Sequence, residues 1–186
     1  MMKHKKLKNN GYEIYKQFFN LKDIANIKKV LNKKIIEAEK KDINIIYDLH
    51  NVDKFFIDLI SNDRLTKLLI PILNDKYYKS INKNKPNYIL SEYIAARSSK
   101  DGLHLHIDSW VPSSSNFCNM VQIVIPLGKR DNTNGCSILV PGSHKSDKYA
   151  NRNINKSKIK NIEIDSGDMV IWDSRTWHGT SQFTQN

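Results

Sequence analysis

The chain has 186 residues, of which 39% are hydrophobic and 26% charged, and its 30 Lys and Arg against 19 Asp and Glu give a formal net charge of +11. This length suits one domain that buries roughly 70% of the surface its unfolded chain exposes, and the hydrophobic content excludes a disordered chain. Two cysteines exclude a disulfide framework and a cysteine-rich zinc module. The basic N-terminus is not followed by the apolar stretch of a secretory signal. The apolar runs are too short to span a membrane, so we expect a cytoplasmic protein without a membrane span.

The positive charge does not by itself predict a nucleic-acid partner. Five of the 30 basic residues are Arg, and Lys, Asn and Ile are abundant throughout the chain. This mixture is typical of an A+T-rich coding sequence, and the lysines do not alternate with aromatic residues in a recognition pattern. We therefore expect no specific nucleic-acid partner.

The first 85 residues are expected to form a largely helical preface. Residues 11–19 alternate like a short strand, and residues 21–41 follow with apolar residues at helical spacing. Further helices are expected over residues 52–61 and 62–74, with a cap at the start of the second and a kink or early end at Pro71. The apolar face of the first long helix is predicted from Leu21, Ile24, Ile27, Val30, Leu31, Ile35 and Ile36.

From residue 86 onward the pattern changes to short apolar or alternating runs separated by turn residues. Strands at this density predict an antiparallel sandwich or barrel and not a βαβ fold. We therefore expect a single domain over residues 1–186, with the preface at 1–85 and a β core at 86–186. The predicted strands are residues 87–97, 103–110, 118–127, 136–140, 159–164, 168–172 and 176–182.

Two motifs in the β half carry metal-ligand chemistry. In the first, His104, His106 and Asp108 alternate with apolar residues, so a strand would present all three on one face. In the second, a Gly167-Asp168 turn feeds a strand, and the next strand delivers His178. Two His and one carboxylate on a common face make the facial triad of non-haem Fe(II), which leaves three coordination positions open. His104 shares the face, so a His-x-His pair is an alternative to the pair of His106 and Asp108.

A third motif lies between these two: Asn134-Gly135, followed by Val140-Pro-Gly-Ser-His144. The order His-x-Asp, then this motif, then Gly-Asp and His-Gly resembles the phytanoyl-CoA dioxygenase-like family of Fe(II)/2-oxoglutarate oxygenases. The resemblance implies a mainly β fold with N-terminal helices around a double-stranded β-helix core, the jelly-roll or cupin-like fold. It also implies that His106, Asp108 and His178 are the iron ligands. Related halogenases lack the carboxylate, so the presence of Asp108 favours hydroxylation.

The resemblance also indicates which residues would bind 2-oxoglutarate. Thr180 occupies the place where the family commonly has a Ser or Thr that contacts the co-substrate carboxylate. The family's main carboxylate anchor is an Arg that lies further beyond the distal His than this sequence extends, so we expect a C-terminally truncated form or a substitute cation. Arg97 and Arg175 are candidates for that cation, and Tyr93 is a candidate to line the pocket.

The function implied is an Fe(II)/2-oxoglutarate-dependent dioxygenase that hydroxylates a C–H of a small metabolite or lipid-like molecule, with release of succinate and CO₂. Its expected partners are that small molecule, 2-oxoglutarate and O₂. Two alternatives remain: a non-catalytic jelly-roll module that binds a metal or ligand, and a prolyl-hydroxylase-like enzyme that acts on a peptide. The pattern predicts neither the substrate nor the oligomeric state.

Overall fold

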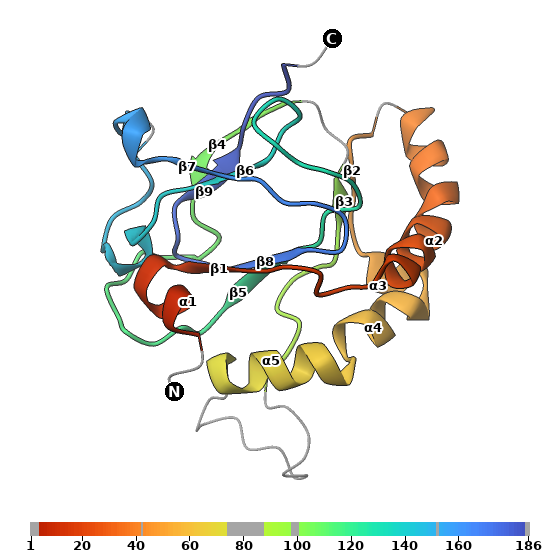
Figure 1. Cartoon of the computed structure of the whole chain (residues 1–186), viewed down its shortest axis with the longest axis horizontal. Coiled ribbons are helices and arrows are strands. Elements are labelled where there is room, and N and C mark those ends of the chain that lie inside the picture. The colour runs from red at the N-terminus through yellow and green to blue at the C-terminus, as the bar shows by residue number, and fades with distance from the viewer. Residues whose placement is uncertain (1–3, 42, 74–87, 98–100, 152, 185–186) are drawn as a thin grey trace. The chain divides into compact units, whose positions relative to one another are not determined.

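A computed structural model describes residues 4–41, 43–73, 88–97, 101–151 and 153–184 (Figure 1). The chain forms two compact units. One comprises Ile27–Ser99 and is mostly helical; we call it the helical unit. The other combines Met1–Asn26 with Lys100–Asn186 and contains two β-sheets; we call it the sheet unit.

The sheet unit contains two antiparallel sheets, and the chain crosses repeatedly from one to the other. The three-stranded sheet has the order β1-β8-β5, and the four-stranded sheet has the order β4-β9-β6-β7. This arrangement confirms the expected mainly β, jelly-roll class. The strands are β1 (Tyr12–Tyr15), β4 (Leu103–His106), β5 (Val121–Val124), β6 (Ser137–Leu139), β7 (Lys160–Ile162), β8 (Met169–Asp173) and β9 (His178–Thr180).

Strand β8 is the centre of the sheet unit. All five of its residues are buried, because it lies between β1 and β5 in its sheet. Val170 and Trp172 alternate onto one face, where they pack in a cluster with Leu139 of β6 and Ile162 of β7. Since β6 and β7 belong to the other sheet, this cluster is the apolar core that joins the two layers.

The strand predictions hold for six of the seven segments. Five of the observed strands are shorter than their predicted runs, whereas β8 has the predicted length and begins one residue later. The exception is the segment 87–97, of which residue 87 lies outside the described residues. Only β3 (Ala96–Arg97) forms there, and it pairs with β2 (Ile45–Ile46) within the helical unit. The carbonyl of Ile94 instead accepts a hydrogen bond from the Leu49 N–H at the start of a helix.

The long helix α2 (Leu21–Glu39) begins at a reciprocal cap. The Asn20 side chain accepts from the Asp23 N–H at 2.8 Å, and the Asp23 carboxylate accepts from the Asn20 N–H at 3.2 Å. Ile24, Ile27 and Leu31 form its buried stripe. The expectation that Leu21 and Ile36 also belong to that stripe is wrong, because both side chains are exposed.

The remaining helices are short. Asn62 caps α5, accepting from the Leu65 N–H at 2.9 Å, as expected. Pro71 lies inside the last turns of α5 and does not end it there, since the helix continues to Leu73. Within the described residues, no helix has the length and hydropathy needed to cross a bilayer. The short helices are α1 (Lys5–Asn10), α3 (Leu49–Val52), α4 (Lys54–Ile60) and α5 (Asp63–Leu73), and 3₁₀ turns form at Ser143–Lys145 and Lys156–Lys158.

Candidate metal centre

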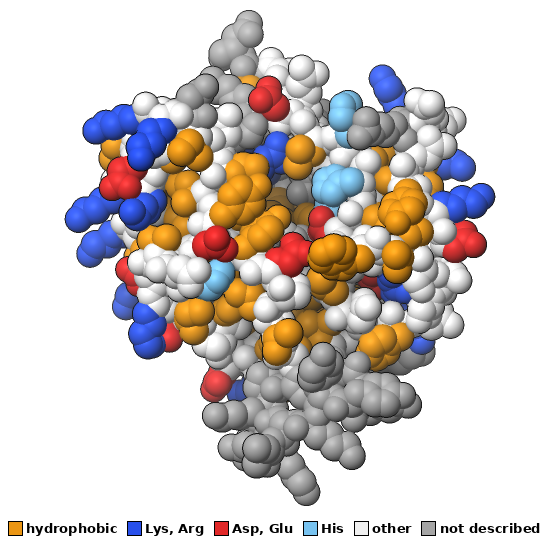
Figure 2. Space-filling view, turned by 180° about the vertical axis from the view of Figure 1, so that it is seen from behind, with side chains coloured by type: hydrophobic (Ala, Val, Ile, Leu, Met, Phe, Trp, Pro, Cys, Tyr) orange, Lys and Arg blue, Asp and Glu red, His pale blue; other side chains and the backbone are white. Residues whose placement is uncertain are grey.

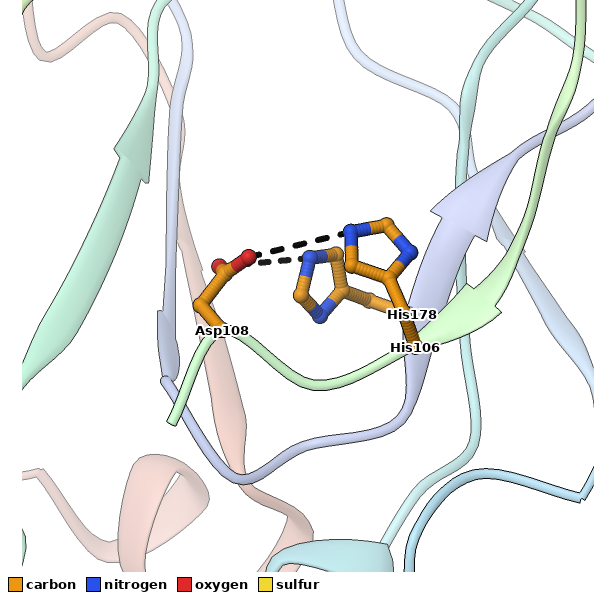
Figure 3. A group of neighbouring side chains, drawn as sticks. All are labelled: His106, Asp108 and His178. Atoms are coloured by element: carbon orange, nitrogen blue, oxygen red, sulfur yellow. Dashed lines mark ion pairs between the residues drawn. The ribbon is translucent and has the colours of Figure 1, made fainter. Parts of the chain in front are cut away.

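Three side chains of the sheet unit converge at the edge where β4 meets β9. His106 ends β4, His178 begins β9, and the two residues are direct cross-strand partners. Asp108 lies two residues beyond the end of β4, and its carboxylate faces both imidazoles (Figure 3). One ligand atom from each of the three residues lies within 4.8 Å of the others. The sequence expected Asp108 on a continuous strand face; it is delivered instead by the chain turning after His106.

The tautomers of both histidines follow from their backbone contacts. His106 Nδ1 lies 2.8 Å from the carbonyl oxygen of His104, and His178 Nδ1 lies 2.9 Å from that of Thr176. A carbonyl oxygen can only accept, so each Nδ1 carries the hydrogen. In a neutral imidazole this leaves Nε2 with a free lone pair, which is the arrangement that orients a metal-binding histidine.

Both Nε2 atoms point at the Asp108 carboxylate. His178 Nε2 lies 3.3 Å from Oδ2, and His106 Nε2 lies 3.7 Å from Oδ1 (Figure 3). Burial opposes ionisation of Asp108, but the neighbouring His178, His106 and Trp172 side chains outweigh it and hold its pKa below the ordinary value. The carboxylate is therefore charged at neutral pH.

A cation fits the centre of this cluster. Two imidazole lone pairs and a carboxylate repel one another unless a proton or metal ion lies between them. Asp108 Oδ2 is buried without a hydrogen-bond partner, and a group left in that state costs about 1–3 kcal/mol. Two imidazoles and one carboxylate, with no thiolate, match the donor set of a facial Fe(II) site.

Gly179 permits the close approach of the two strands that carry the histidines. A Cβ atom at Gly179 would clash with the Leu103 carbonyl oxygen and would lie 3.1 Å from that of His104. The pairing of β4 with β9 is irregular between Leu103 and His106. The His-Gly pair of the motif thus has a steric reason: only glycine fits beside His178 at this distance.

The turn between β8 and β9 positions the backbone of Asp108. The Ser174 carbonyl oxygen accepts from the Asp108 N–H at 2.9 Å and from the Ser109 N–H at 3.1 Å. This turn is closed by a buried ion pair, in which Arg175 Nε and Nη2 donate to the two carboxylate oxygens of Asp173 at 2.8 and 2.6 Å. Arg175 Nη1 also donates to the carbonyl of Ser115 at 2.6 Å.

These contacts decide the role of Arg175, which the sequence offered as a candidate cation for 2-oxoglutarate. Its side chain is 4% exposed, and all three guanidinium nitrogens already donate within the protein. The candidate assignment is therefore wrong. The side-chain hydrogen bond to Asp173 holds the Arg175 pKa above its ordinary value despite burial.

The Val-Pro-Gly-Ser-His motif has a structural function. Ser143 Oγ donates to the Val140 carbonyl at 2.7 Å and accepts from the Trp177 N–H at 2.8 Å, while the Val140 N–H donates to the Trp177 carbonyl at 2.9 Å. The loop thus fixes the residue immediately before His178. His144 is buried, and its Nε2 donates to the Lys8 carbonyl at 3.1 Å.

The other predicted site residues occupy different places. Thr180 ends β9, two residues beyond His178. Arg97 lies in β3 and Tyr93 contacts Tyr47 through an edge-to-face ring pair at 4.9 Å, both within the helical unit. The side chain of His104 is exposed and outside the three-residue cluster; its contribution is the backbone carbonyl that accepts from His106. The roles of Thr180, Arg97 and Tyr93 toward 2-oxoglutarate remain predictions.

Sequence reasoning missed the Asp173–Arg175 pair. The spacing of Asp173 and Arg175, two residues apart just before His178, was the available signal. The spacing alone does not show that Arg175 closes a turn, because a carbonyl that accepts from its guanidinium lies some sixty residues earlier in the chain.

A comparison with protein-family models matches the family described as phytanoyl-CoA dioxygenase (PhyH) over residues 8–185. The chain belongs to this family. A curated relative, dioxygenase af480 of Aspergillus fumigatus, is 23% identical to this phytanoyl-CoA dioxygenase family member over 149 residues, or 77% of the chain. The match spans 44% of that relative's length.

Solved structures show the same fold at low sequence identity. EctD from S. alaskensis, crystallised with 2-oxoglutarate and 5-hydroxyectoine, matches this chain with a TM-score of 0.74 at 14% sequence identity. The match covers 97% of this chain and 69% of the EctD chain. HygX from Streptomyces hygroscopicus, crystallised with nickel and 2-oxoglutarate, matches with a TM-score of 0.74 at 16% sequence identity. This match covers 100% of this chain and 83% of the HygX chain.

Proposed function

We propose that this family member is an Fe(II)- and 2-oxoglutarate-dependent dioxygenase, with His106, Asp108 and His178 as the iron ligands. The observation that carries the proposal is the convergence of two Nε2 lone pairs, fixed by their Nδ1 hydrogen bonds, on an ionised carboxylate. Family membership and the metal and 2-oxoglutarate bound by HygX support it.

The protein's own residues would set the geometry of the reaction. The carbonyls of His104 and Thr176 orient the two imidazoles, and the Ser174 carbonyl fixes the backbone of Asp108. Thr180 is proposed to contact the 2-oxoglutarate carboxylate, with Arg97 and Tyr93 as further contacts. Bound iron would supply the oxidation of a C–H bond coupled to decarboxylation of 2-oxoglutarate to succinate and CO₂.

We propose a small metabolite or lipid-like molecule as the substrate. The loop that follows Asp108 exposes Trp110 and Val111, whose side chains are 86% and 62% accessible. Tyr149 is exposed as well, and its hydroxyl donates to the Trp110 carbonyl at 3.3 Å, which ties a second loop to the first. Figure 2 shows hydrophobic side chains exposed beside His and acidic ones on one face of the molecule. Exposed apolar groups next to a metal site favour an apolar ligand.

The test is an anaerobic titration of the chain with Fe(II) and 2-oxoglutarate, followed by admission of O₂. We expect a visible charge-transfer absorption from the chelated co-substrate and then release of succinate. Asp108→Ala and His178→Ala should each weaken Fe(II) binding by more than about 100-fold. This loss exceeds the one typical when a residue that only hydrogen-bonds a metal ligand is removed. Normal iron affinity in both variants would overturn the ligand assignment. Iron binding without succinate, across a substrate panel that includes peptides, would instead support a non-catalytic binding module.

A further inference from the structure

Trp172 carries a buried polar atom that the fold itself does not use. The side chain is 4% exposed, and its indole Nε1 is buried without a hydrogen-bond partner. A buried N–H in this state is destabilising, and such groups are rare in native proteins. Trp172 lies on the inner face of β8, in the core that joins the two sheets.

The unpartnered N–H lies beside the candidate metal centre. The Trp172 ring is 4.9 Å from the ring of His178, and His178 Nε2 is 3.3 Å from Asp108 Oδ2. That carboxylate oxygen is itself buried and without a hydrogen-bond partner. An unpaired donor and an unpaired acceptor therefore border the same imidazole.

A facial site needs a carboxylate that gives one oxygen to the metal and keeps the other away from it, because three positions must stay open. The second oxygen then requires a donor. Metal-binding carboxylates are in turn hydrogen-bonded, and loss of such a partner typically costs about 10–100-fold in metal affinity.

We propose that the indole N–H of Trp172 is a positioning donor to the metal-free oxygen of the Asp108 carboxylate, holding that ligand in its one-oxygen binding mode. This inference rests on the proposed function, since it takes Asp108 as a metal ligand. Trp172 would act through Asp108 and not on the substrate.

The main test is isothermal titration of Co(II) into Trp172→Phe, which keeps an aromatic ring in the core and removes the N–H. We expect about tenfold weaker binding than in the unaltered chain. The matched control is Trp177→Phe: its Nε1 donates to the Lys148 carbonyl at 3.1 Å, so Co(II) affinity should not change. Circular dichroism and thermal unfolding establish that both variants are folded.

The outcomes separate the inference from the proposed function. If Asp108→Ala loses Co(II) binding and folded Trp172→Phe binds as tightly as the unaltered chain, the role of Trp172 is overturned and the metal site stands. If Asp108→Ala also binds Co(II) normally, the metal site itself fails.

A second measurement needs no change at Trp172. In ¹⁵N-Trp-labelled protein, the three indole resonances can be assigned by elimination with Trp110→Phe and Trp177→Phe. Addition of Zn(II) should shift the Trp172 N–H downfield as its hydrogen bond forms. A resonance that does not move while Zn(II) is bound would contradict the proposal.

Discussion

The helical unit and the sheet unit obtain their structures in different ways. Two helices of the first, α4 and α5, begin at neighbouring polar side chains: Asp53 accepts from the Phe55 N–H two residues away, and Asn62 accepts from the Leu65 N–H. The elements of the second depend on partners far along the chain: Arg175 contacts the carbonyl of Ser115, and His106 faces His178. The candidate site lies in the unit built from distant contacts, so damage to a few polar contacts there should affect both stability and metal binding.

The largest effect is expected from Asp173→Asn in the sheet unit. The change leaves the Arg175 charge buried without its carboxylate, which costs about 3–5 kcal/mol of unfolding free energy. It should also weaken metal binding, because the turn that holds the Asp108 backbone loosens. The comparison is Asp58→Asn, which breaks the exposed Lys54–Asp58 pair of α4 and should cost less than about 0.5 kcal/mol. Urea denaturation of both variants measures the difference; equal costs would refute it.

A smaller effect is expected from Gly179→Ala, also in the sheet unit. The added methyl group forces β4 away from β9, with a cost of about 1–3 kcal/mol for an overpacked position. Since His106 moves with β4, Co(II) affinity should fall together with stability. A destabilised variant that keeps its full metal affinity would show that the strand spacing does not set the site.

Asp168→Asn should change the acid stability of the sheet unit. Burial alone would raise the pKa of Asp168, but hydrogen bonds from the backbone N–H groups of Asp165 and Gln17 and from Lys16 hold it below the ordinary 3.8. A depressed folded pKa contributes stability above the unfolded value and loses it as pH falls through the folded one. The variant should therefore be less stable by about 1–2 kcal/mol at pH 7 and match the unaltered chain in strong acid. Parallel stability curves from pH 7 downward would contradict this.

Apart from the Asp58→Asn comparison, the smallest effect also belongs to the helical unit. Asp53→Ala removes the side-chain cap of α4 and should cost about 1 kcal/mol. Metal affinity should stay unchanged, since the hydrogen bond that this change removes is local to that helix. A weaker Co(II) affinity in this variant would remove the contrast between the two units.

The sequence predicted most elements that have a strong local pattern. The alternation around His106 and the run before His178 predicted β4, β8 and β9, and helical spacing predicted α2. It did not predict β2, α1 or α3, because these short elements lie outside the runs whose apolar residues recur with a clear period. The spacing of Leu21 and Ile36 also misled, since an apolar residue at a helical interval need not be covered by a neighbour.

The candidate metal ligands were accessible from the sequence because their residue types and order are distinctive. Their supporting contacts were not. The tautomers of His106 and His178 are set by backbone carbonyls, which every residue possesses and no pattern marks. The unpartnered N–H of Trp172 likewise depends on which side chains the fold places around it, and an apolar run at β8 does not reveal them.

The pairing of β1 with β8 has a consequence for how the chain is made. Tyr12 pairs with Trp172, a residue 160 positions later. At a synthesis rate of about 5–20 residues per second, β1 leaves the ribosome roughly 10–30 s before its partner exists. During that interval its backbone hydrogen-bonding groups have no strand to pair with, and folding must await the closure of a very long loop. The edge that carries the candidate metal centre, which includes His178 of β9, is therefore among the last parts of the sheet unit to form.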